Sequence, residues 1–472
     1  MPNTGANAYP SRYRWLGLTG SFALACGGLT AGALPAAVTG PTLRASGGAG
    51  TTLAFAGLAV LTVAWLRLGR PADGQLPPGT RWMLVTLAWW AAPLLAIPPL
   101  FSRDVYSYLA QGAMLAGGLD VYTDGPAVLG GATAVQIPGV WQHTPTPYGP
   151  VFLLLARAAA PVAAHPYAGT LLLRLAAVLA VAALAGLLVA LARHFGTDPA
   201  SALRLGALNP LVLLHLIAGA HNDALLLALL AGGLLAAVHR RTLIAAALVT
   251  LAALVKAPAA LALPVVWWLG AGTPTGHRPR AAQLLRTAGP VALAAAATTI
   301  AATAAAGTGY GWLAALTTPA TTSSWSLTTS LGRTLSALSG TAPDPLVAAM
   351  RLLGLAAAVA ITALACWLVA RRGLEPVAAL ALALAALVAL GPAFRPWYAL
   401  WSIALIAAAV RIPAVRRIAG FVCAALAFTV MPDGFTPDAP ELVLAIGGVA
   451  AGYSFIVLAE RQITVEERQL AC

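Results

Sequence analysis

The chain has 472 residues, of which 60% are hydrophobic and only 9% are charged. Soluble domains carry about a quarter charged residues, so this composition excludes a water-soluble globular protein. The formal net charge of +13 does not indicate nucleic-acid binding, because the arginines occupy short turns between apolar runs, where charges set membrane topology. The four cysteines stand far apart and contain no CxxC pair, so they predict neither a metal site nor a disulfide framework.

Apolar runs recur along the whole chain. A helix needs about 20 apolar residues to cross a bilayer, and we predict an all-α polytopic membrane protein with about 12–14 transmembrane helices. Residues 1–472 form a single transmembrane domain in this prediction, and residues 242–271 are either two short helices or one broken helix. The spans are expected near residues 15–38, 51–67, 82–100, 169–192, 203–218, 222–238, 242–257, 259–271, 285–306, 346–370, 375–392, 397–411, 416–431 and 440–459.

The distribution of arginines predicts the orientation. Residues 148–164 are apolar but follow Pro145, Pro147 and Pro150, so we interpret them as a juxtamembrane or re-entrant helix. With the amino terminus inside, most of the 27 basic residues then face the cytoplasm. This predicts a multi-pass plasma-membrane protein with both termini cytoplasmic. Two long segments, 101–168 and 307–345, are expected on the extracytoplasmic face.

Asp104 is the leading catalytic candidate. It follows an apolar helix, where low-dielectric protein meets water, and partial burial there raises the pKa of a carboxylate into the range of a general base. Arg103, Tyr106 and Tyr108 surround it in sequence and are expected to contact substrate. The alternative is that Asp104 pairs with Arg103 or caps the next helix.

Lys256 and Arg395 are the candidates for binding a phosphate. Each cation lies within or beside an apolar segment and is followed by proline, and desolvation strengthens the contact of such a cation with an anion. Lys256 is the single lysine of the chain. Trp397 and Tyr398, which follow Arg395, are expected to contact substrate. The alternatives are snorkelling of either cation to lipid headgroups and, for Arg395, membership of an interfacial aromatic belt with Trp397 and Tyr398.

Two further groups carry polar or aromatic side chains. The segment from Trp141 to Pro150 (WQHTPTPYGP) is stiffened by prolines, and Trp141, His143 and Tyr148 suit a sugar, although a rigid loop with satisfied polar groups fits equally. The triplet His221, Asn222 and Asp223 either caps a helix or lines the same cavity.

Familiar cofactor motifs are absent from the sequence. It contains no Walker A motif, GxGxxG, HExxH, GxSxG or DxD pair. We therefore expect no cofactor, no metal and no nucleotide-sugar donor.

The segments from Phe101 to Gly112 (FSRDVYSYLAQG), from Gly118 to Tyr122 (GLDVY) and from Pro145 to Pro150 (PTPYGP) resemble the GT-C membrane glycosyltransferases of actinobacteria. The similarity is greatest to the polyprenol-phosphomannose-dependent α-(1→6)-mannosyltransferases, the MptA/MptB group. The later motifs HNDA at 221–224, KAP at 256–258 and RPWY at 395–398 fit this group in the same order, so the resemblance covers nearly the whole chain. Val121 departs from the proline expected in the relatives.

The resemblance implies a GT-C-type helical bundle with an extracytoplasmic catalytic first loop and Asp104 as the general base. It implies transfer of mannose from polyprenol-phosphate mannose, a membrane lipid donor, to a growing α-(1→6)-mannan, the backbone of lipomannan and lipoarabinomannan, as a glycolipid or mannan acceptor. Lys256 and Arg395, with Arg333 as a weaker third cation, would stabilise the leaving phosphate, and the anomeric centre would be inverted.

Two alternatives remain at this point. The same fold is compatible with another polyprenol-phosphate sugar such as arabinofuranose. A transporter or flippase of a polyprenyl-linked glycan is the other, but transporters have internal repeats and polar residues at the midplane. This chain instead gathers its polar groups at one predicted face, which favours an enzyme.

Overall fold

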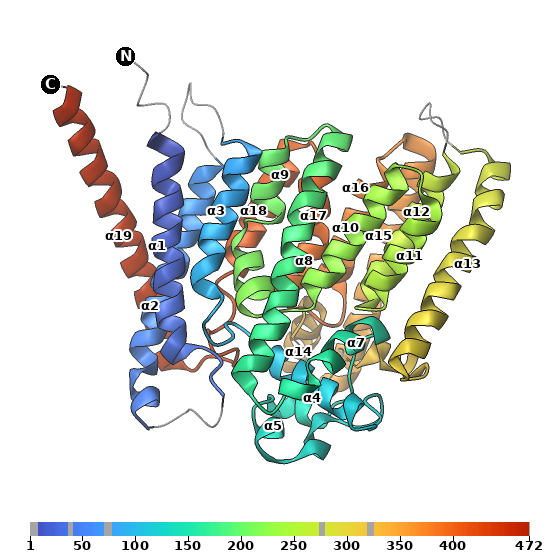
Figure 1. The fold of residues 1–472 in the computed structure, drawn as a ribbon, viewed down its shortest axis with the longest axis horizontal. Helices are drawn as coiled ribbons and strands as arrows, with labels where there is room; N and C mark the ends of the chain where they lie inside the picture. Colours follow the sequence, from blue (N-terminus) through green and yellow to red (C-terminus); the bar gives the residue numbers. More distant parts are fainter. Residues whose placement is uncertain (1–7, 36–40, 70–77, 273–278, 319–324, 472) are drawn as a thin grey trace.

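The computed structural model describes residues 8–35, 41–69, 78–272, 279–318 and 325–471, and this part of the chain is helical without a β-strand. Figure 1 shows the long helices standing side by side, with the short helices α4, α5 and α7 gathered at one end of the molecule. The beginning of α1 and the end of α19 lie at the opposite end. The all-helical polytopic architecture predicted from the sequence is confirmed.

The elements follow one another in four groups. The first contains α1 (Ala8–Ala31), α2 (Pro41–Leu68), α3 (Thr80–Ala91) and the 3-10 turn η2 (Ala92–Leu94). The second contains the short elements α4 (Asp104–Ala116), η3 (Pro126–Leu129), α5 (Gly131–Val135), α6 (Gly139–Gln142), α7 (Pro150–Ala158) and η4 (Ala160–Val162). The third contains α8 (Pro166–Phe195), α9 (Pro199–Gly206), the π-helical η5 (Val212–Ala218), α10 (Asp223–Val238), α11 (Thr242–Ala253), η6 (Ala257–Ala262) and α12 (Leu263–Ala271). The fourth contains α13 (Ala281–Ala306), η7 (Gly311–Thr317), α14 (Leu327–Ser339), α15 (Pro343–Arg372), α16 (Pro376–Leu390), η8 (Pro396–Tyr398), α17 (Ala399–Ala409), α18 (Pro413–Leu426) and α19 (Ala439–Ala471).

Within the described ranges, five helices are long and apolar enough to cross a membrane alone: Gly47–Leu68, Pro166–Phe195, Ala281–Ala306, Pro343–Arg372 and Ala439–Arg461. A sixth candidate is the pair η5 and α10, which is bent by 108°. The 12–14 predicted spans exceed this number because prolines and turns divide several apolar runs into short helices. The run at 242–271 is broken into α11, η6 and α12, and residues 150–158 form only the short helix α7.

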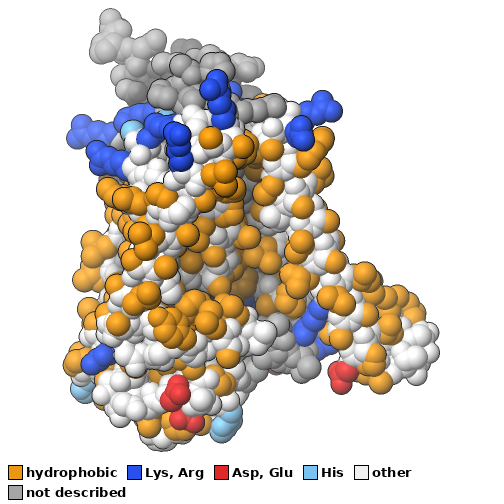
Figure 2. Space-filling view, turned by 90° about the vertical axis from the view of Figure 1, so that its right-hand side faces the viewer, with side chains coloured by type: hydrophobic (Ala, Val, Ile, Leu, Met, Phe, Trp, Pro, Cys, Tyr) orange, Lys and Arg blue, Asp and Glu red, His pale blue; other side chains and the backbone are white. Residues whose placement is uncertain are grey.

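Charge is distributed unevenly along the long direction of the helices. Figure 2 shows most Lys and Arg side chains of that face gathered at one end and acidic side chains at the other, with an apolar and hollowed region between them. This asymmetry is the pattern that the positive-inside rule requires. The orientation with both termini cytoplasmic stays a prediction.

Arg174 on α8 holds two broken helix ends together. It is almost fully buried, and its guanidinium donates hydrogen bonds to the carbonyl oxygens of Leu95 and Ile97, each at 2.7 Å, which follow η2. The same group donates to Ile217 at 3.2 Å and Ala218 at 2.7 Å, at the end of η5. Carbonyls at helix ends lack intrahelical partners, and unsatisfied ones are costly in a membrane. One side chain therefore stabilises the two segments that lead to Asp104 and to His221.

Replacing Arg174 with methionine keeps much of the apolar stem and leaves four carbonyl oxygens without their donor. We expect Arg174→Met to lower the free energy of unfolding by at least about 3 kcal/mol, since each buried unsatisfied group costs about 1–3 kcal/mol. The thermal midpoint of the detergent-solubilised protein measures this, with Arg157→Met on the exposed side of α7 as the matched control. Equal midpoints for both variants would contradict the role given to Arg174.

Candidate active site

A cavity of about 390 Å³ lies where the short helices that follow Asp104 meet the broken ends of the apolar helices. Its polar lining includes a carboxylate, an amine and a guanidinium, and apolar side chains form the rest. The lining residues are Asp104, Ser107, Gln111, Trp141, Thr144, Pro145, Pro147, Tyr148, Lys256, Ala257, Pro258, Leu316, Leu387, Val388, Gly391, Pro392, Ala393, Phe394, Arg395, Tyr398 and Trp401.

Asp104 enters this cavity as the first residue of α4. The chain reaches it through Phe101, which is buried and has φ +60°, an uncommon conformation for a bulky residue that persists only where packing enforces it. Ser102 then accepts a hydrogen bond from the Asp104 backbone N–H at 3.1 Å. The carboxylate is 23% exposed and lies 3.6 Å from His221 Nδ1. The tight turn at Phe101 and Ser102 therefore places the Asp104 carboxylate at the cavity wall.

Lys256 lies in the gap between α11 and η6. Its backbone is extended (φ −153°, ψ 124°), and η6 begins at the next residue, Ala257, with Pro258 in its first turn. The carbonyls of Leu254 and Val255 at the end of α11 accept hydrogen bonds from the backbone N–H groups of Val151 and Gly149. A Cβ on Gly149 would lie 2.2 Å from the Leu254 oxygen, so only glycine permits this approach. The contact brings the proline-rich loop, and Tyr148 with it, beside Lys256.

The Lys256 amine is surrounded by aromatic rings and one carboxylate. Its Nζ lies 4.9 Å from the ring centroid of Tyr398, 5.6 Å from that of Tyr148 and 5.7 Å from that of Trp401. It also donates a hydrogen bond to Asp223 Oδ2 at 2.7 Å. Cation–π contacts and an ion pair stabilise the charge in a desolvated place. The amine is therefore fixed at the cavity wall rather than extended to lipid headgroups.

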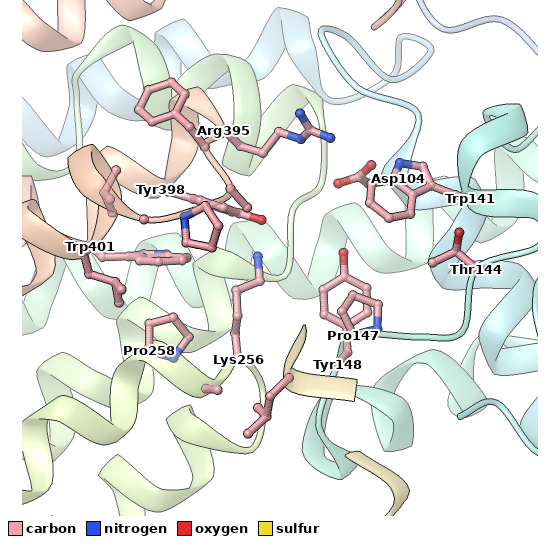
Figure 3. A pocket seen from close by; sticks show the side chains of 18 of the residues that line it. Asp104, Trp141, Thr144, Pro147, Tyr148, Lys256, Pro258, Arg395, Tyr398 and Trp401 are labelled. Atoms are coloured by element: carbon pink, nitrogen blue, oxygen red, sulfur yellow. The ribbon is translucent and has the colours of Figure 1, made fainter. Parts of the chain in front are cut away.

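Arg395 approaches the cavity from the opposite side. The chain leaves α16 at Gly391, and Arg395 is extended (φ −137°, ψ 145°) because the proline that follows it disfavours a helical conformation. Figure 3 shows its guanidinium pointing toward the Asp104 carboxylate across the cavity, with the Lys256 amine between Tyr398 and Tyr148. Two cations and one acid that are far apart in sequence thus share one space.

The triplet His221, Asn222 and Asp223 lies behind the cavity wall. It follows Ala220, which has φ +53°, and all three side chains are buried. His221 Nδ1 is 3.2 Å from the Tyr108 hydroxyl, and its ring lies 3.9 Å from that of Trp397. The triplet, Tyr108 and Trp397 lie outside the cavity lining. Substrate contact was the prediction for Tyr108 and Trp397, and for the triplet it was one of two interpretations.

Four other predicted substrate or phosphate ligands also lie outside the cavity lining. Arg103 donates hydrogen bonds to the carbonyls of Leu34 and Gln136 and lines a separate cavity with Asp433. The Tyr106 hydroxyl donates to the Ala33 carbonyl at 2.6 Å. His143 and Arg333 are exposed. The predicted residues that do meet in the cavity are Asp104, Trp141, Tyr148, Lys256, Arg395 and Tyr398.

The structure adds polar residues that sequence reasoning missed. Ser107 and Gln111 follow Asp104 at helical spacing, so the face of α4 that carries Asp104 also carries them into the cavity. Thr144 lies in the proline-rich loop, and Trp401 follows Tyr398 by one helical turn. The helical periodicity of residues 104, 107 and 111 was the available signal. In the described part of the chain, no three His, Cys, Asp or Glu side chains are grouped as metal ligands.

Burial raises the pKa of Asp104 above its usual range. Arg395 and Lys256 act in the opposite direction, Asp223 raises the pKa further, and a hydrogen bond from Ser102 lowers it. The net effect is a carboxylate that accepts a proton more readily than one in water. A carboxylate facing two cations across a partly apolar cavity can take a proton from a hydroxyl while the cations hold an anion.

Comparisons with known proteins give similarities along most of the chain. The family described as "Alpha-(1->6)-mannopyranosyltransferase, N-terminal domain" matches residues 14–272, and "MptB C-terminal domain" matches residues 321–460. Alpha-(1->6)-mannopyranosyltransferase A of Mycobacterium tuberculosis is 34% identical over 425 residues, which cover 86% of this chain and 81% of the relative. Alpha-(1->6)-mannopyranosyltransferase B of Corynebacterium glutamicum is 31% identical over 95% of this chain and 81% of its own length. No solved structure matches the chain.

An acid and two cations around a cavity at the ends of apolar helices mark a functional site that can stabilise an anion, and the names of the relatives place the protein among the membrane glycosyltransferases. The two matched regions together span most of the chain, and the similarity to curated relatives runs along nearly all of it. The chain belongs to the α-(1→6)-mannopyranosyltransferase family, in the MptA/MptB group. The resemblance seen in the sequence motifs is thereby confirmed.

The raised pKa of Asp104 predicts how stability depends on pH. Because its pKa is higher in the folded than in the unfolded protein, the ionised carboxylate disfavours folding above the folded pKa, and this penalty disappears as pH falls through the folded and then the unfolded pKa. We therefore expect Asp104→Asn to have a higher thermal midpoint than the wild type at pH 7. The difference should shrink as the pH is lowered. A lower midpoint for Asp104→Asn at every pH would contradict this assignment.

Proposed function

We propose that this protein transfers mannose from polyprenol-phosphate mannose to a growing α-(1→6)-mannan of the lipomannan and lipoarabinomannan type, on the extracytoplasmic face of the plasma membrane. The observation that carries the proposal is that Asp104, Lys256 and Arg395 line one cavity. The family of the chain supports the mannosyl group and the linkage. The acceptor is a glycolipid or mannan, and no nucleotide sugar is used.

Each charged residue of the cavity has a role in the proposed transfer reaction. The acceptor hydroxyl attacks the anomeric carbon of mannose, its proton passes to the Asp104 carboxylate, and a new C–O bond forms on the face opposite the phosphate. The old C–O bond breaks with its electron pair going to the phosphate oxygen. Lys256 and Arg395 stabilise the negative charge that develops there, in an environment where water does not screen it. Attack from the opposite face inverts the anomeric centre.

The apolar part of the cavity suits a lipid-linked donor. Leu316, Leu387, Val388 and Phe394 lie on the lining that also carries Arg395. A prenyl chain packed there leaves the membrane only at its phosphate end, so the phosphate reaches the cations without crossing water. Trp141 and Tyr148 lie on the side of Asp104, where stacking on an aromatic ring would hold a sugar.

The function is tested by incubating the purified protein with polyprenol-phosphate mannose and a short α-(1→6)-mannoside, followed by mass spectrometry of the product. The expected result is extension of the acceptor by one or more mannose units. Extension from a polyprenol-phosphate arabinofuranose, with none from the mannose donor, would assign the fold to a different sugar. Movement of a lipid-linked glycan across vesicles without any new glycosidic bond would indicate a transporter.

Asp104→Asn removes the proton acceptor while keeping the size of the side chain. We expect the turnover number to fall at least about 100-fold, since a general base contributes about 10²–10⁴-fold to the rate. Binding of the donor lipid should persist, because both cations remain. Turnover is measured with the same mannoside assay, and binding with a labelled donor lipid. Normal turnover by the folded variant would remove Asp104 from its role.

Arg395 and Arg333 are distinguished by a matched pair of substitutions. Arg395→Gln removes a guanidinium from the cavity, and we expect the KM for the donor to rise about 10- to 100-fold, as charged hydrogen bonds contribute about 1.5–3 kcal/mol. Arg333→Gln changes an exposed residue of α14 and should have the smaller effect. A larger effect of Arg333→Gln would show that α14 holds the phosphate instead.

A further inference from the structure

Asp223 cannot contact a sugar in this structure, because it is fully buried and both of its carboxylate oxygens are occupied. Oδ2 accepts a hydrogen bond from Lys256 Nζ at 2.7 Å, and Oδ1 accepts one from Trp401 Nε1 at 2.7 Å. Lys256 and Trp401 both line the cavity, whereas Asp223 does not. The carboxylate therefore acts on the cavity only through these two neighbours and through its charge.

The charges around Asp104 are balanced only when Asp223 is included. Arg395 and Lys256, which immediately precede η8 and η6, lower the pKa of Asp104, whereas the charge of Asp223 at the beginning of α10 raises it. The other titratable or hydrogen-bonding groups around it are His221, Ser102, Tyr108, Tyr148 and Tyr398, and none of them supplies a second negative charge at neutral pH. The two cations are thus opposed by two carboxylates. Without Asp223, the excess positive charge would hold Asp104 in its ionised form and weaken it as a base.

We infer that Asp223 is a positioning and charge-compensating residue of the transfer reaction: it fixes Lys256 at the cavity and offsets its charge, so that one site both binds a phosphate and keeps a basic Asp104. This inference rests on the proposed function. It resolves a conflict within the site, since cations that stabilise a leaving phosphate also make a nearby carboxylate less basic. Trp401 is the second part of the arrangement because its indole holds the other carboxylate oxygen.

The decisive variant is Asp223→Asn, which keeps the shape and removes the charge. Lys256 then gains attraction for the donor phosphate, and Asp104 loses basicity. We expect the KM for the donor to fall about threefold, kcat to fall about tenfold, and the acidic limb of the pH–rate profile to move down by about one pH unit. A residue that served packing alone would move KM and kcat without moving the pH profile.

Three further variants separate charge from geometry. Asp223→Glu restores the charge and should return the acidic limb to its wild-type position even if kcat stays reduced. Trp401→Phe removes the hydrogen bond to Asp223 and reduces the ring that contacts Lys256, but it changes no charge. The acidic limb should therefore not move, while the donor KM rises because Lys256 is less well fixed. The double variant Asp223→Asn/Lys256→Met removes both charges; its limb should return close to that of the wild type, with weaker donor binding.

The double variant still tests the inference if the Asp223→Asn protein does not fold. Removing one partner of a buried ion pair is strongly destabilising, whereas replacing both is often tolerated. If only the double variant folds, its pH limb still reports whether the two charges cancel at Asp104. A limb displaced from the wild-type position in the double variant would overturn the inference, as would an unmoved limb in a folded Asp223→Asn protein.

A measurement without substrate separates this inference from the proposed function. The difference in thermal midpoint between proteins with and without Asp104→Asn reports the folded-state pKa of Asp104. In the Asp223→Asn background this difference should be smaller at pH 7, and it should begin to fall at a lower pH than in the wild type. Failure of the wild type to transfer mannose would reject the function but leave this result interpretable. An unchanged difference would reject the role of Asp223 whatever the enzyme transfers.

Discussion

The satisfaction of backbone carbonyls at broken helix ends is the constraint on which the rest of this structure depends. A membrane helix ordinarily satisfies its own peptide groups, and each interruption exposes carbonyls that water does not reach. Arg174 supplies donors to four of them, and Gly149 and Val151 supply backbone donors to two more at the end of α11. Because these ends are satisfied, the chain can leave the helix at Phe101, Ala220 and Lys256, where the polar residues of the cavity begin.

Burying charged groups at the cavity lowers the stability of the folded protein, and the same burial makes these groups reactive. A desolvated carboxylate disfavours folding, and the surrounding cations offset only part of that effect. The pair formed by Lys256 and Asp223 follows a different principle, since each charge is matched by a hydrogen-bonded partner at 2.7 Å. The cavity therefore combines a compensated pair, which stays fixed, with an acid whose ionised form is disfavoured by burial and which is ready to take a proton.

The sequence was sufficient to predict the helical membrane architecture and the principal acid and cations. Asp104, Lys256 and Arg395 could be recognised because each charge stands at the end of an apolar run, a placement that has a physical cost. The direction of neighbouring side chains could not be predicted. Arg103 and Asp104 are adjacent, yet Arg103 turns to the carbonyls of Leu34 and Gln136. Such directions depend on tertiary contacts between segments far apart in sequence.

The same interruptions explain why the active site and the lipid-facing surface can be continuous. An unbroken helix presents only side chains to a neighbouring cavity, whereas the extended backbone at Lys256 and Arg395 lets both cations reach inward from the ends of apolar helices. The apolar side chains of α16 and η7 then lie beside the cations rather than a helix length away. A ligand with a hydrocarbon tail and a phosphate end needs that arrangement, since its two parts have opposite solvent preferences across a single bond. Helices shortened by proline and glycine are in this sense the feature of the fold that would give the proposed lipid-phosphate donor access to the cations.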